Sequence, residues 1–343
     1  MIDSSVAKIS AACEAQQDQA LMGIDNQLAS YKKDMEYRLS RLEASGSDID
    51  YLEKNVDKIR GIFLTHGHED HIGAIPYVLR TINPPIYGTR LTLGILQNKL
   101  AEQRLPHKVK MNTVSAGDTV KLGAFSAEFI RVTHSIADAC CIAITTPVGV
   151  VLHSGDFKID VSPIDGDMID LTRIGEYGKK GVLLFMCEST NVGRAGFTPS
   201  ERKVGTSLDL IFMNNPTKRV IVATFSSNVH RVQQIINYSA KYGRKVAITG
   251  RSMLNVVGAA VELGYMTVPD KVLIDISEIG RYKPNQITII TTGSQGEPMS
   301  ALYRMAFSDH NQVELTSGDL VVLSSHANPG NEKQVGSNIN EMY

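Results

Sequence analysis

The sequence lacks the marks of a disulfide-bonded, zinc-knuckle or membrane protein. Four of its 343 residues are cysteines; none has C-x-x-C spacing and two are adjacent, which fits a reducing compartment. No run approaches about 18 consecutive apolar residues, and the N-terminus lacks the basic-then-apolar order of a signal peptide. These absences predict a soluble, cytoplasmic protein without a membrane partner.

An excess of charge of one sign is also missing. Lys and Arg number 35 against 36 Asp and Glu, which gives a net charge of -1. Such a balance carries no global sign of a nucleic-acid partner, so any basic groove must be local.

The length favours two domains. With 43% hydrophobic residues, 343 residues suffice for one large domain or for two of roughly 150 residues each, and two fits better. Residues 1–47 are expected to form an atypical helical N-terminal segment, because apolar side chains recur there at spacings of three and four. These apolar positions are Leu28, Tyr31, Met35, Leu39 and Leu42.

From residue 48 onward, strand-like runs alternate with helical ones. Strand-like runs at 126–132, 141–152 and 182–187 predict a layered domain over residues 48–200. A second domain is expected over residues 201–343, where regular βα alternation predicts a parallel, doubly wound sheet with ligand-facing loops at its carboxyl edge. Its expected strands are 219–224, 245–249, 286–292 and 319–325, and its expected helices are 229–241 and 251–264.

A cluster of metal-capable side chains follows the apolar run at residues 61–64. Residues 65–71 read THGHEDH, and a strand that ends in a tight loop there would direct these side chains into one small volume. Two later candidates also follow strand-like runs. Imidazoles and carboxylates are the ligands that zinc or manganese prefers. The predicted metal ligands are His66, His68, Asp70, His71, His134 and Asp156.

This ordered series resembles the metallo-β-lactamase fold hydrolases, whose sites usually bind two metal ions. Loops of the second domain resemble the β-CASP domain of ribonuclease J. The matching segments are CESTN (187–191), SSNVHRV (226–232), GRSM (250–253), TTGSQGEPMS (291–300) and PGNE (329–332). The resemblance runs from about Asp48 to Tyr343. It implies an α/β fold class, with an αββα sandwich of metallo-β-lactamase type followed by a doubly wound β-CASP domain.

The resemblance also implies an activity and its cofactors. It implies a metal-dependent ribonuclease, both endonuclease and 5′-to-3′ exonuclease, acting in RNA maturation and turnover with two divalent ions, zinc first and manganese as the alternative. His66, His68 and His134 would hold one ion. Asp70 and His71 would hold the other, with Asp156 bridging the two, and Asp70 would also help to orient the attacking water. RNA is the implied partner, and the full-length protein is expected to form a homo-oligomer or a hetero-oligomer with a paralogue.

Several further residues could have either a functional role or an ordinary structural role. In the family an acidic residue at the position of Glu188 orients a catalytic histidine, although a capping or surface role is the alternative. Hydroxyl and backbone N–H groups at a helix start can hold a phosphate, or simply cap the helix. Basic residues there can contact RNA or lie on a solvated face. The predicted substrate-binding residues are Ser226, Ser227, Asn228, His230, Arg231 and Ser294.

The sequence also departs from the family. Residues 1–45 lack the family's Gly-rich opening strands, with Asp25 only a weak substitute for the aspartate of its Ile-Asp-x-Gly type strand, and the chain stops before the family's Ser-Gly-His-Ala loop. We therefore expect a fragment with reduced activity, and two alternatives stay open. One is a catalytically impaired RNA-binding or assembly subunit, and the other is a β-CASP DNA nuclease. A thioesterase of the glyoxalase type is disfavoured, because a small thioester needs no polymer channel.

Overall fold

The computed structural model describes residues 49–343 except 104, 165, 191, 194, 329 and 343. The helical segment predicted for residues 1–47 lies outside the described residues. The chain divides into two compact units, Met1–Ile59 and Arg60–Tyr343. The described residues of the first unit form helix α2 (Asp50–Lys54) and the 3-10 turn η1 (Val56–Lys58).

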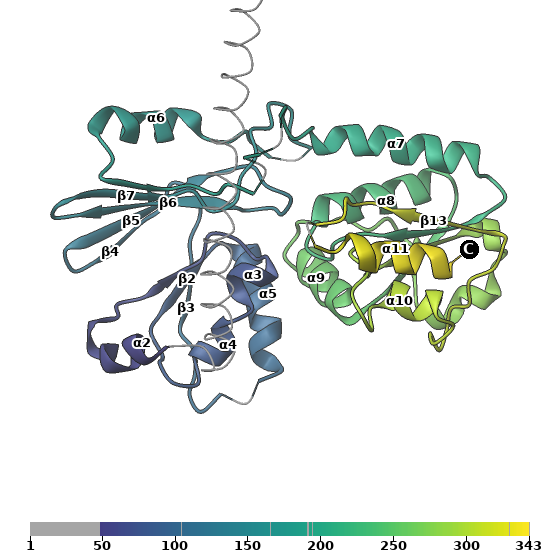
Figure 1. The fold of residues 1–343 in the computed structure, drawn as a ribbon, viewed down its shortest axis with the longest axis horizontal. Helices are drawn as coiled ribbons and strands as arrows, with labels where there is room; N and C mark the ends of the chain where they lie inside the picture. The colour runs from purple at the N-terminus through teal and green to yellow at the C-terminus, as the bar shows by residue number, and fades with distance from the viewer. Residues whose placement is uncertain are drawn as a thin grey trace, which may run out of the picture. The chain divides into compact units, whose positions relative to one another are not determined.

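The second unit begins with two sheets packed face to face (Figure 1). In the first sheet, β1, β2 and β3 are parallel, and in the second, β4 to β7 form an antiparallel meander with β8 parallel to β7. Apolar side chains join the two, with the ring centroids of Phe63 and Phe129 6.0 Å apart. The strands are β1 (Ile62–Phe63), β2 (Ile86–Gly88), β3 (Met111–Thr113), β4 (Thr119–Leu122), β5 (Phe125–Arg131), β6 (Cys140–Thr146), β7 (Gly149–His153) and β8 (Leu184–Met186).

Helices cover the outer faces of this sandwich. Helices α3 (Glu69–Ile72), α4 (Ile75–Val78) and α5 (Arg90–Ala101) lie on the first sheet, and α6 (Leu171–Lys180) lies on the second (Figure 1). Tyr177 of α6 donates to Glu128 of β5 at 2.6 Å, which fastens the helix to the sheet. The layer order is therefore αββα, as the resemblance implied.

One predicted strand-like run is in fact two strands joined by a turn. Residues 141–152 were expected as a single strand-like run, yet they form most of the β6–β7 hairpin, in which Thr146 pairs with Gly149. The Thr146 hydroxyl accepts from the Val148 N–H and donates to the Gly149 carbonyl, closing the turn. The turn lies at Pro147 and Val148, and Pro and Gly within the run were the available sequence signal for it.

The remainder of the second unit is a five-stranded parallel sheet in the order β11-β10-β12-β9-β13. In the described part of the chain, no helix is both long and apolar enough to cross a membrane. The strands are β9 (Arg219–Ala223), β10 (Lys245–Thr249), β11 (Leu273–Ile274), β12 (Ile287–Thr291) and β13 (Asp319–Leu323). The helices and 3-10 turns are α7 (Glu201–Asn214), α8 (Val229–Lys241), α9 (Arg251–Glu262), η2 (Ile276–Arg281), η3 (Pro284–Gln286), α10 (Ala301–Ala306) and α11 (Glu332–Glu341).

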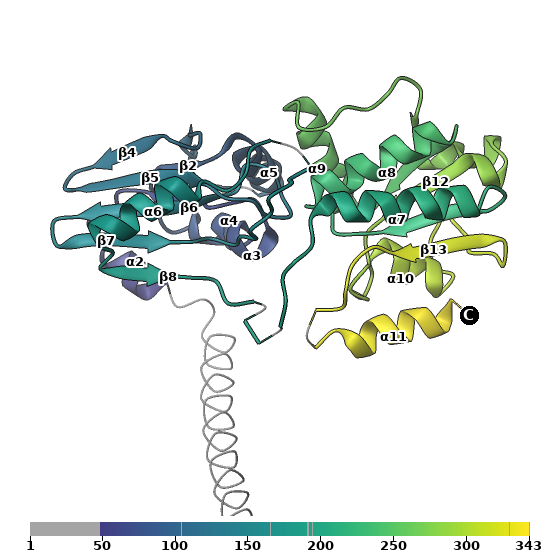
Figure 2. The ribbon, with the colours of Figure 1, turned by 90° about the horizontal axis from the view of Figure 1, so that it is seen from above.

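Both faces of this sheet are covered, as Figure 2 shows from above. Strand β9 alternates its side chains between the two faces. Val220 and Val222 join the core formed with α8 and α9, whereas Ile221 packs with Ala301 and Met305 of α10. The predicted doubly wound arrangement is confirmed.

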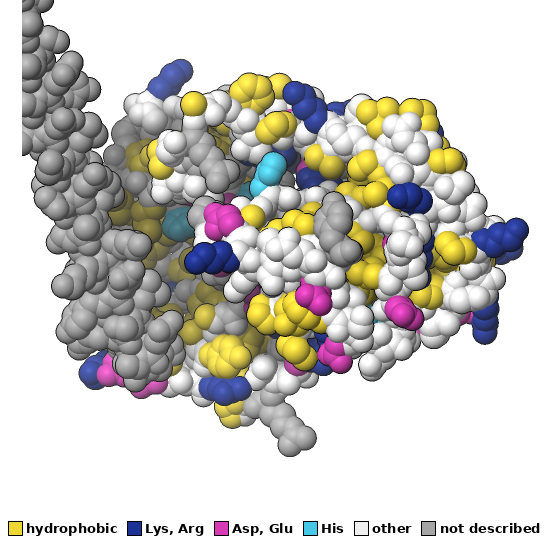
Figure 3. Space-filling view, turned by 45° about the vertical axis from the view of Figure 1, so that its right-hand side comes forward, with side chains coloured by type: hydrophobic (Ala, Val, Ile, Leu, Met, Phe, Trp, Pro, Cys, Tyr) yellow, Lys and Arg dark blue, Asp and Glu magenta, His cyan; other side chains and the backbone are white. Residues whose placement is uncertain are grey.

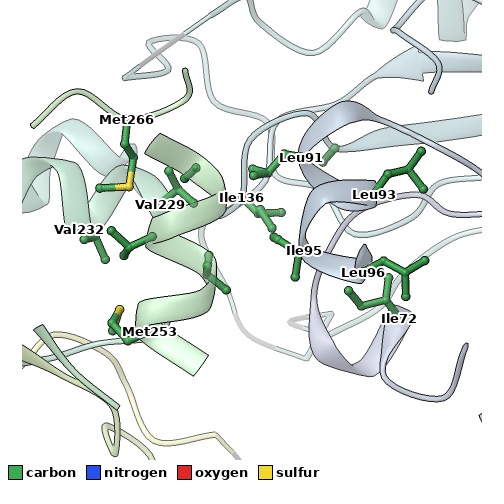
Figure 4. Close-up of a cluster of buried hydrophobic side chains, with 14 of the residues drawn as sticks. Ile72, Leu91, Leu93, Ile95, Leu96, Ile136, Val229, Val232, Met253 and Met266 are labelled. Atoms are coloured by element: carbon green, nitrogen blue, oxygen red, sulfur yellow. The ribbon is translucent and has the colours of Figure 1, made fainter. Parts of the chain in front are cut away.

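A single apolar core continues from the sandwich into the parallel-sheet region. In Figure 4, Ile136 lies between Leu91 and Ile95 of α5 and Val229 at the start of α8. Nearby, the Tyr265 hydroxyl donates to Asp138. These contacts hold the 134–138 loop, which begins with a predicted metal ligand.

Candidate metal centre

The first group of ligands lies on a short loop between β1 and α3. Leu64 continues the pairing of β1 through its N–H bond to the Tyr87 carbonyl, and His68 is the N-cap of α3. Asp70 and His71 thus occupy the first turn of that helix, directly after His68. The loop fits closely against α5, since a Cβ on Gly67 would lie 3.1 Å from Ile95.

The remaining ligands come from the second sheet. Strands β5, β7 and β8 run in the same direction, so their carboxyl ends lie at one edge of the sheet. His134 follows β5, Asp156 follows β7 and Glu188 follows β8. This shared direction explains why three strand-end residues, far apart in sequence, meet beside the β1 loop.

The described residues offer two donor sets. In the first set, the Nδ1 atom of His68 lies 3.0 Å from Nε2 of His66 and 3.0 Å from Nε2 of His134. In the second set, Nε2 of His71 lies 3.7 Å from Oδ2 of Asp70.

Asp156 belongs to both sets. Its Oδ2 atom lies 3.8 Å from Nε2 of His134, and its Oδ1 atom lies 3.5 Å from Nε2 of His71. Because each oxygen faces a different set, this carboxylate is placed to bridge two cations.

Burial keeps the three histidines of the first donor set neutral. It lowers the pKa of His66 to about 2, of His134 to about 3 and of His68 to about 4, and neighbouring imidazoles add to the shift. A neutral imidazole has a free lone pair at pH 7, which is the form that binds metal. Burial also raises the pKa of Asp156, and the nearby carboxylates of Asp70 and Glu188 act in the same direction.

The donor geometry fits divalent ions. Zinc–nitrogen bonds of about 2.1 Å place tetrahedral ligand atoms roughly 3.4 Å apart, and right-angled ones about 3.0 Å apart. The donor–donor separations of 3.0 to 3.8 Å span these values. A cation would also relieve the repulsion between Asp156 and its acidic neighbours. The cluster thus supports divalent metal binding, and the geometry does not distinguish zinc from manganese.

Glu188 lies at the margin of this cluster. Its carboxylate accepts the N–H of Thr190 at 2.8 Å, and its own N–H donates to Ser154 Oγ at 3.0 Å. The side chain thus caps its own turn, the ordinary role considered for it, while its charge still acts on Asp156. A role in orienting a histidine stays a prediction.

The predicted substrate-binding residues differ in their exposure and in how many hydrogen bonds they make within the protein. The Asn228 side chain caps α8 by accepting the N–H of Arg231, whose guanidinium donates to Glu201 and to Ser324. Ser226 and Ser227 are partly exposed at the turn after β9. These contacts leave Asn228 and Arg231 little freedom to bind a ligand.

Ser294 is buried, and its hydroxyl has no hydrogen-bond partner among the described residues. His230 lines a cavity of about 510 Å³, which His134 also lines. All six substrate assignments stay predictions.

Three contacts at the site were not predicted from the sequence. The Thr65 hydroxyl lies beside two ligand imidazoles, Gly155 packs on Thr65, and Lys158 lies close enough to His134 to lower its pKa. Thr65 and Lys158 each lie within two residues of a predicted ligand. That adjacency was the available signal, but it does not tell which way a side chain points.

The 510 Å³ cavity opens beside His134. Basic side chains from both sheet regions line it, among them Arg90, Arg131, Lys158 and His230. Arg131 and Lys158 are paired with Asp167 and Asp160, so the lining is close to balanced in charge. Figure 3 likewise shows basic and acidic side chains interspersed over one face of the molecule, with histidine reaching the surface near its middle.

Sequence comparisons agree with this architecture. Residues 29–216 match the metallo-beta-lactamase superfamily, and residues 217–342 match the family described as Ribonuclease J, beta-CASP domain. The chain is 47% identical over 297 residues to Ribonuclease J of Synechocystis sp., covering 86% of this chain and 46% of that protein. It is 45% identical over 302 residues to Ribonuclease J of Thermus thermophilus, covering 86% of this chain and 52% of that protein. The chain thus spans about half the length of these relatives.

A solved structure shares the fold at low identity. The crystal structure of a protein of unknown function from Enterococcus faecalis V583 matches with a TM-score of 0.51 and 17% identity, covering 82% of this chain and 73% of that one. The superfamily match spans more than half of the chain, and the β-CASP match takes up most of the remainder. The chain therefore belongs to the metallo-β-lactamase superfamily, and its residues 217–342 form a β-CASP domain of the ribonuclease J type.

Proposed function

We propose that this chain carries the catalytic centre of a ribonuclease that hydrolyses phosphodiester bonds in RNA, as an endonuclease and as a 5′-to-3′ exonuclease. One observation carries the proposal: Asp156 directs its two oxygens toward separate donor sets. That arrangement suits two ions a few ångströms apart, and it occurs in a chain 45–47% identical to proteins named Ribonuclease J. Zinc is the proposed metal, with manganese as the alternative.

Different residues of the chain serve the two proposed ion sites. When bound, the two ions supply a nucleophilic water at neutral pH and clamp the attacking and leaving oxygens of an in-line displacement. The neutral imidazoles of His66, His68 and His134 hold the first site. Asp70 and His71 would hold the second, and Asp156 would contribute one oxygen to each.

The cavity beside His134 is the proposed place for the RNA strand next to the cleaved bond. Its volume of about 510 Å³ lies within the roughly 300–1,000 Å³ of ligand sites. Lys158 and His230 approach this space from the two sheet regions, and basic side chains can position phosphates without reading sequence. We assign the 5′ end of the RNA to the loops carrying Ser226, Ser227 and Ser294.

The test combines metal analysis with cleavage assays. The chain is purified without chelator and with zinc or manganese supplied, and it is then offered 5′-monophosphorylated RNA and DNA of matched sequence. We expect bound metal and RNA products that carry a 5′-phosphate. His68→Ala should abolish both metal binding at the first site and cleavage.

The alternatives predict different outcomes in the same assay. Bound metal and RNA binding without cleavage would favour the impaired RNA-binding subunit. Equal cleavage of DNA would favour the DNA nuclease, and a chain without bound zinc or manganese would refute the metal centre itself. A matched control is Thr288→Val, which changes a fully buried hydroxyl in β12, away from the cluster.

A further inference from the structure

A single hydroxyl group lies between the two donor sets. Thr65 Oγ1 is 3.1 Å from Nδ1 of His66 and 3.4 Å from Nδ1 of His71. His66 belongs to the first set and His71 to the second. We propose that Thr65 is a positioning residue for both metal subsites, because its hydroxyl is the shared acceptor for these two imidazoles.

Proton counting supports this assignment. The Nε2 atom of His66 faces His68, and the Nε2 atom of His71 faces Asp156, so Nε2 is the nitrogen that each ring presents to a cation. A ring that binds a cation through Nε2 carries its hydrogen on Nδ1 and must donate it. A hydroxyl oxygen has two lone pairs, so the one oxygen of Thr65 accepts both hydrogens.

The position of this oxygen is fixed by both sheets. The carbonyl of Thr65 accepts the Cys140 N–H at 2.9 Å, which ties the loop after β1 to the start of β6. The side chain is almost fully buried, and its branched Cβ restricts rotation about χ1.

Gly155 closes the other side of Thr65. It has a φ of +57°, and a Cβ at this position would lie 3.0 Å from Thr65 Cβ. The residue after Gly155 is Asp156, so the loop that carries the bridging carboxylate packs directly on Thr65. The Thr65 side chain thus contacts one imidazole of each donor set, His66 and His71, and also the loop that carries Asp156.

Removal of the hydroxyl should therefore weaken both ions together. Loss of a partner that orients a metal ligand typically costs about 10- to 100-fold in metal affinity. Thr65→Val keeps the shape of the side chain but leaves two Nδ1–H groups without an acceptor. Thr65→Ser keeps the oxygen. Ser135 lies 3.5 Å from His68 only, so Ser135→Ala should affect the first ion alone.

The experiment measures zinc affinity at both sites by competition with a chromophoric chelator. We expect Thr65→Val to weaken both ions about 10- to 100-fold, while Thr65→Ser stays within a few-fold of wild type. Thr288→Val, a swap of the same kind at a buried site away from the cluster, should leave both affinities unchanged. Unchanged affinity in Thr65→Val, or a loss confined to one ion, would overturn the shared role.

A second measurement needs no variant. Nitrogen-15 NMR of the zinc-loaded wild-type chain with labelled histidine reports which ring nitrogen carries hydrogen. We expect both His66 and His71 to carry it on Nδ1, and hydrogen on Nε2 of either ring would overturn the assignment. The inference rests on the proposed metal centre, but neither readout depends on RNA cleavage. Failure of the wild-type chain to bind metal would overturn the centre itself, whereas normal binding in Thr65→Val would overturn only the role of Thr65.

Discussion

Asp156→Asn should separate the two metal subsites, because it removes the carboxylate that faces both. The wild-type oxygens lie 3.5 Å from His71 Nε2 and 3.8 Å from His134 Nε2. An amide has one oxygen acceptor, and its NH₂ group donates, so Asn can serve one cation at most. The first subsite keeps three imidazoles, whereas the second keeps only Asp70 and His71.

The magnitude follows from burial and from the remaining ligands. Removing one partner of a fully buried charge pair costs about 3–5 kcal/mol. The Asp156 side chain is 28% exposed, so we expect the lower end of that range. A loss of about 3 kcal/mol is a factor of roughly 100 in affinity for the second ion. The first ion should lose only about tenfold, since its three imidazoles remain.

Competition with a chromophoric chelator measures both affinities in one titration. Asp70→Asn is the matched control, because its carboxylate belongs to the second donor set and not to the first, and its side chain is 77% exposed. We expect Asp70→Asn to weaken the second ion about tenfold and to leave the first unchanged.

Stability without metal provides an independent check on Asp156→Asn. Burial and the neighbouring carboxylates raise the pKa of Asp156, so its charge destabilises the metal-free fold. The metal-free variant should therefore unfold at the same urea concentration as wild type or a higher one. A loss confined to one ion would refute the bridging role, and a clearly destabilised metal-free variant would contradict the electrostatic argument for Asp156.

Three further predictions concern stability, each measured by urea unfolding. Thr288→Val should stabilise the chain by about 1 kcal/mol, because the Thr288 hydroxyl is fully buried and has no hydrogen-bond partner among the described residues; a destabilised variant would contradict this. The Arg173 guanidinium holds the pKa of Glu128 below its usual range, so this pair should stabilise the fold above about pH 4.5 and lose its effect as the pH falls further. Glu128→Gln should show a flatter acid dependence than wild type, and parallel curves would count against the pairing. Tyr265→Phe should cost about 1–2 kcal/mol, since the half-buried hydroxyl donates to the charged Asp138; a change within error would show that this bond contributes nothing.

Much of the fold was predictable, because local patterns reflect which face of an element is buried. The helix predicted at 229–241 begins and ends as expected, at Val229 and Lys241. The strands expected at 219–224 and 245–249 end within one residue of β9 and β10. Helix α8 buries one face, so the period of its apolar residues carries the information, whereas β9 and β10 are buried on both faces and show as short continuous apolar runs.

Short elements were less predictable. Strand β2 (Ile86–Gly88) and strand β3 (Met111–Thr113) have three residues each, too few for a period to show. The hairpin between β6 and β7 was missed although its turn carries Pro147 and Gly149, because the apolar residues on both sides were taken as one run.

The sequence by itself indicated the metal-capable residues, because imidazoles and carboxylates are the ligand types that zinc and manganese prefer and these residues follow strand-like runs. Tertiary structure decided how they act. It gave Asp156 one oxygen for each donor set and committed the Arg231 guanidinium to Glu201. It also placed one hydroxyl, that of Thr65, against two imidazoles. These outcomes depend on contacts between segments far apart in the chain, and residue spacing does not encode the direction of a side chain across such a contact.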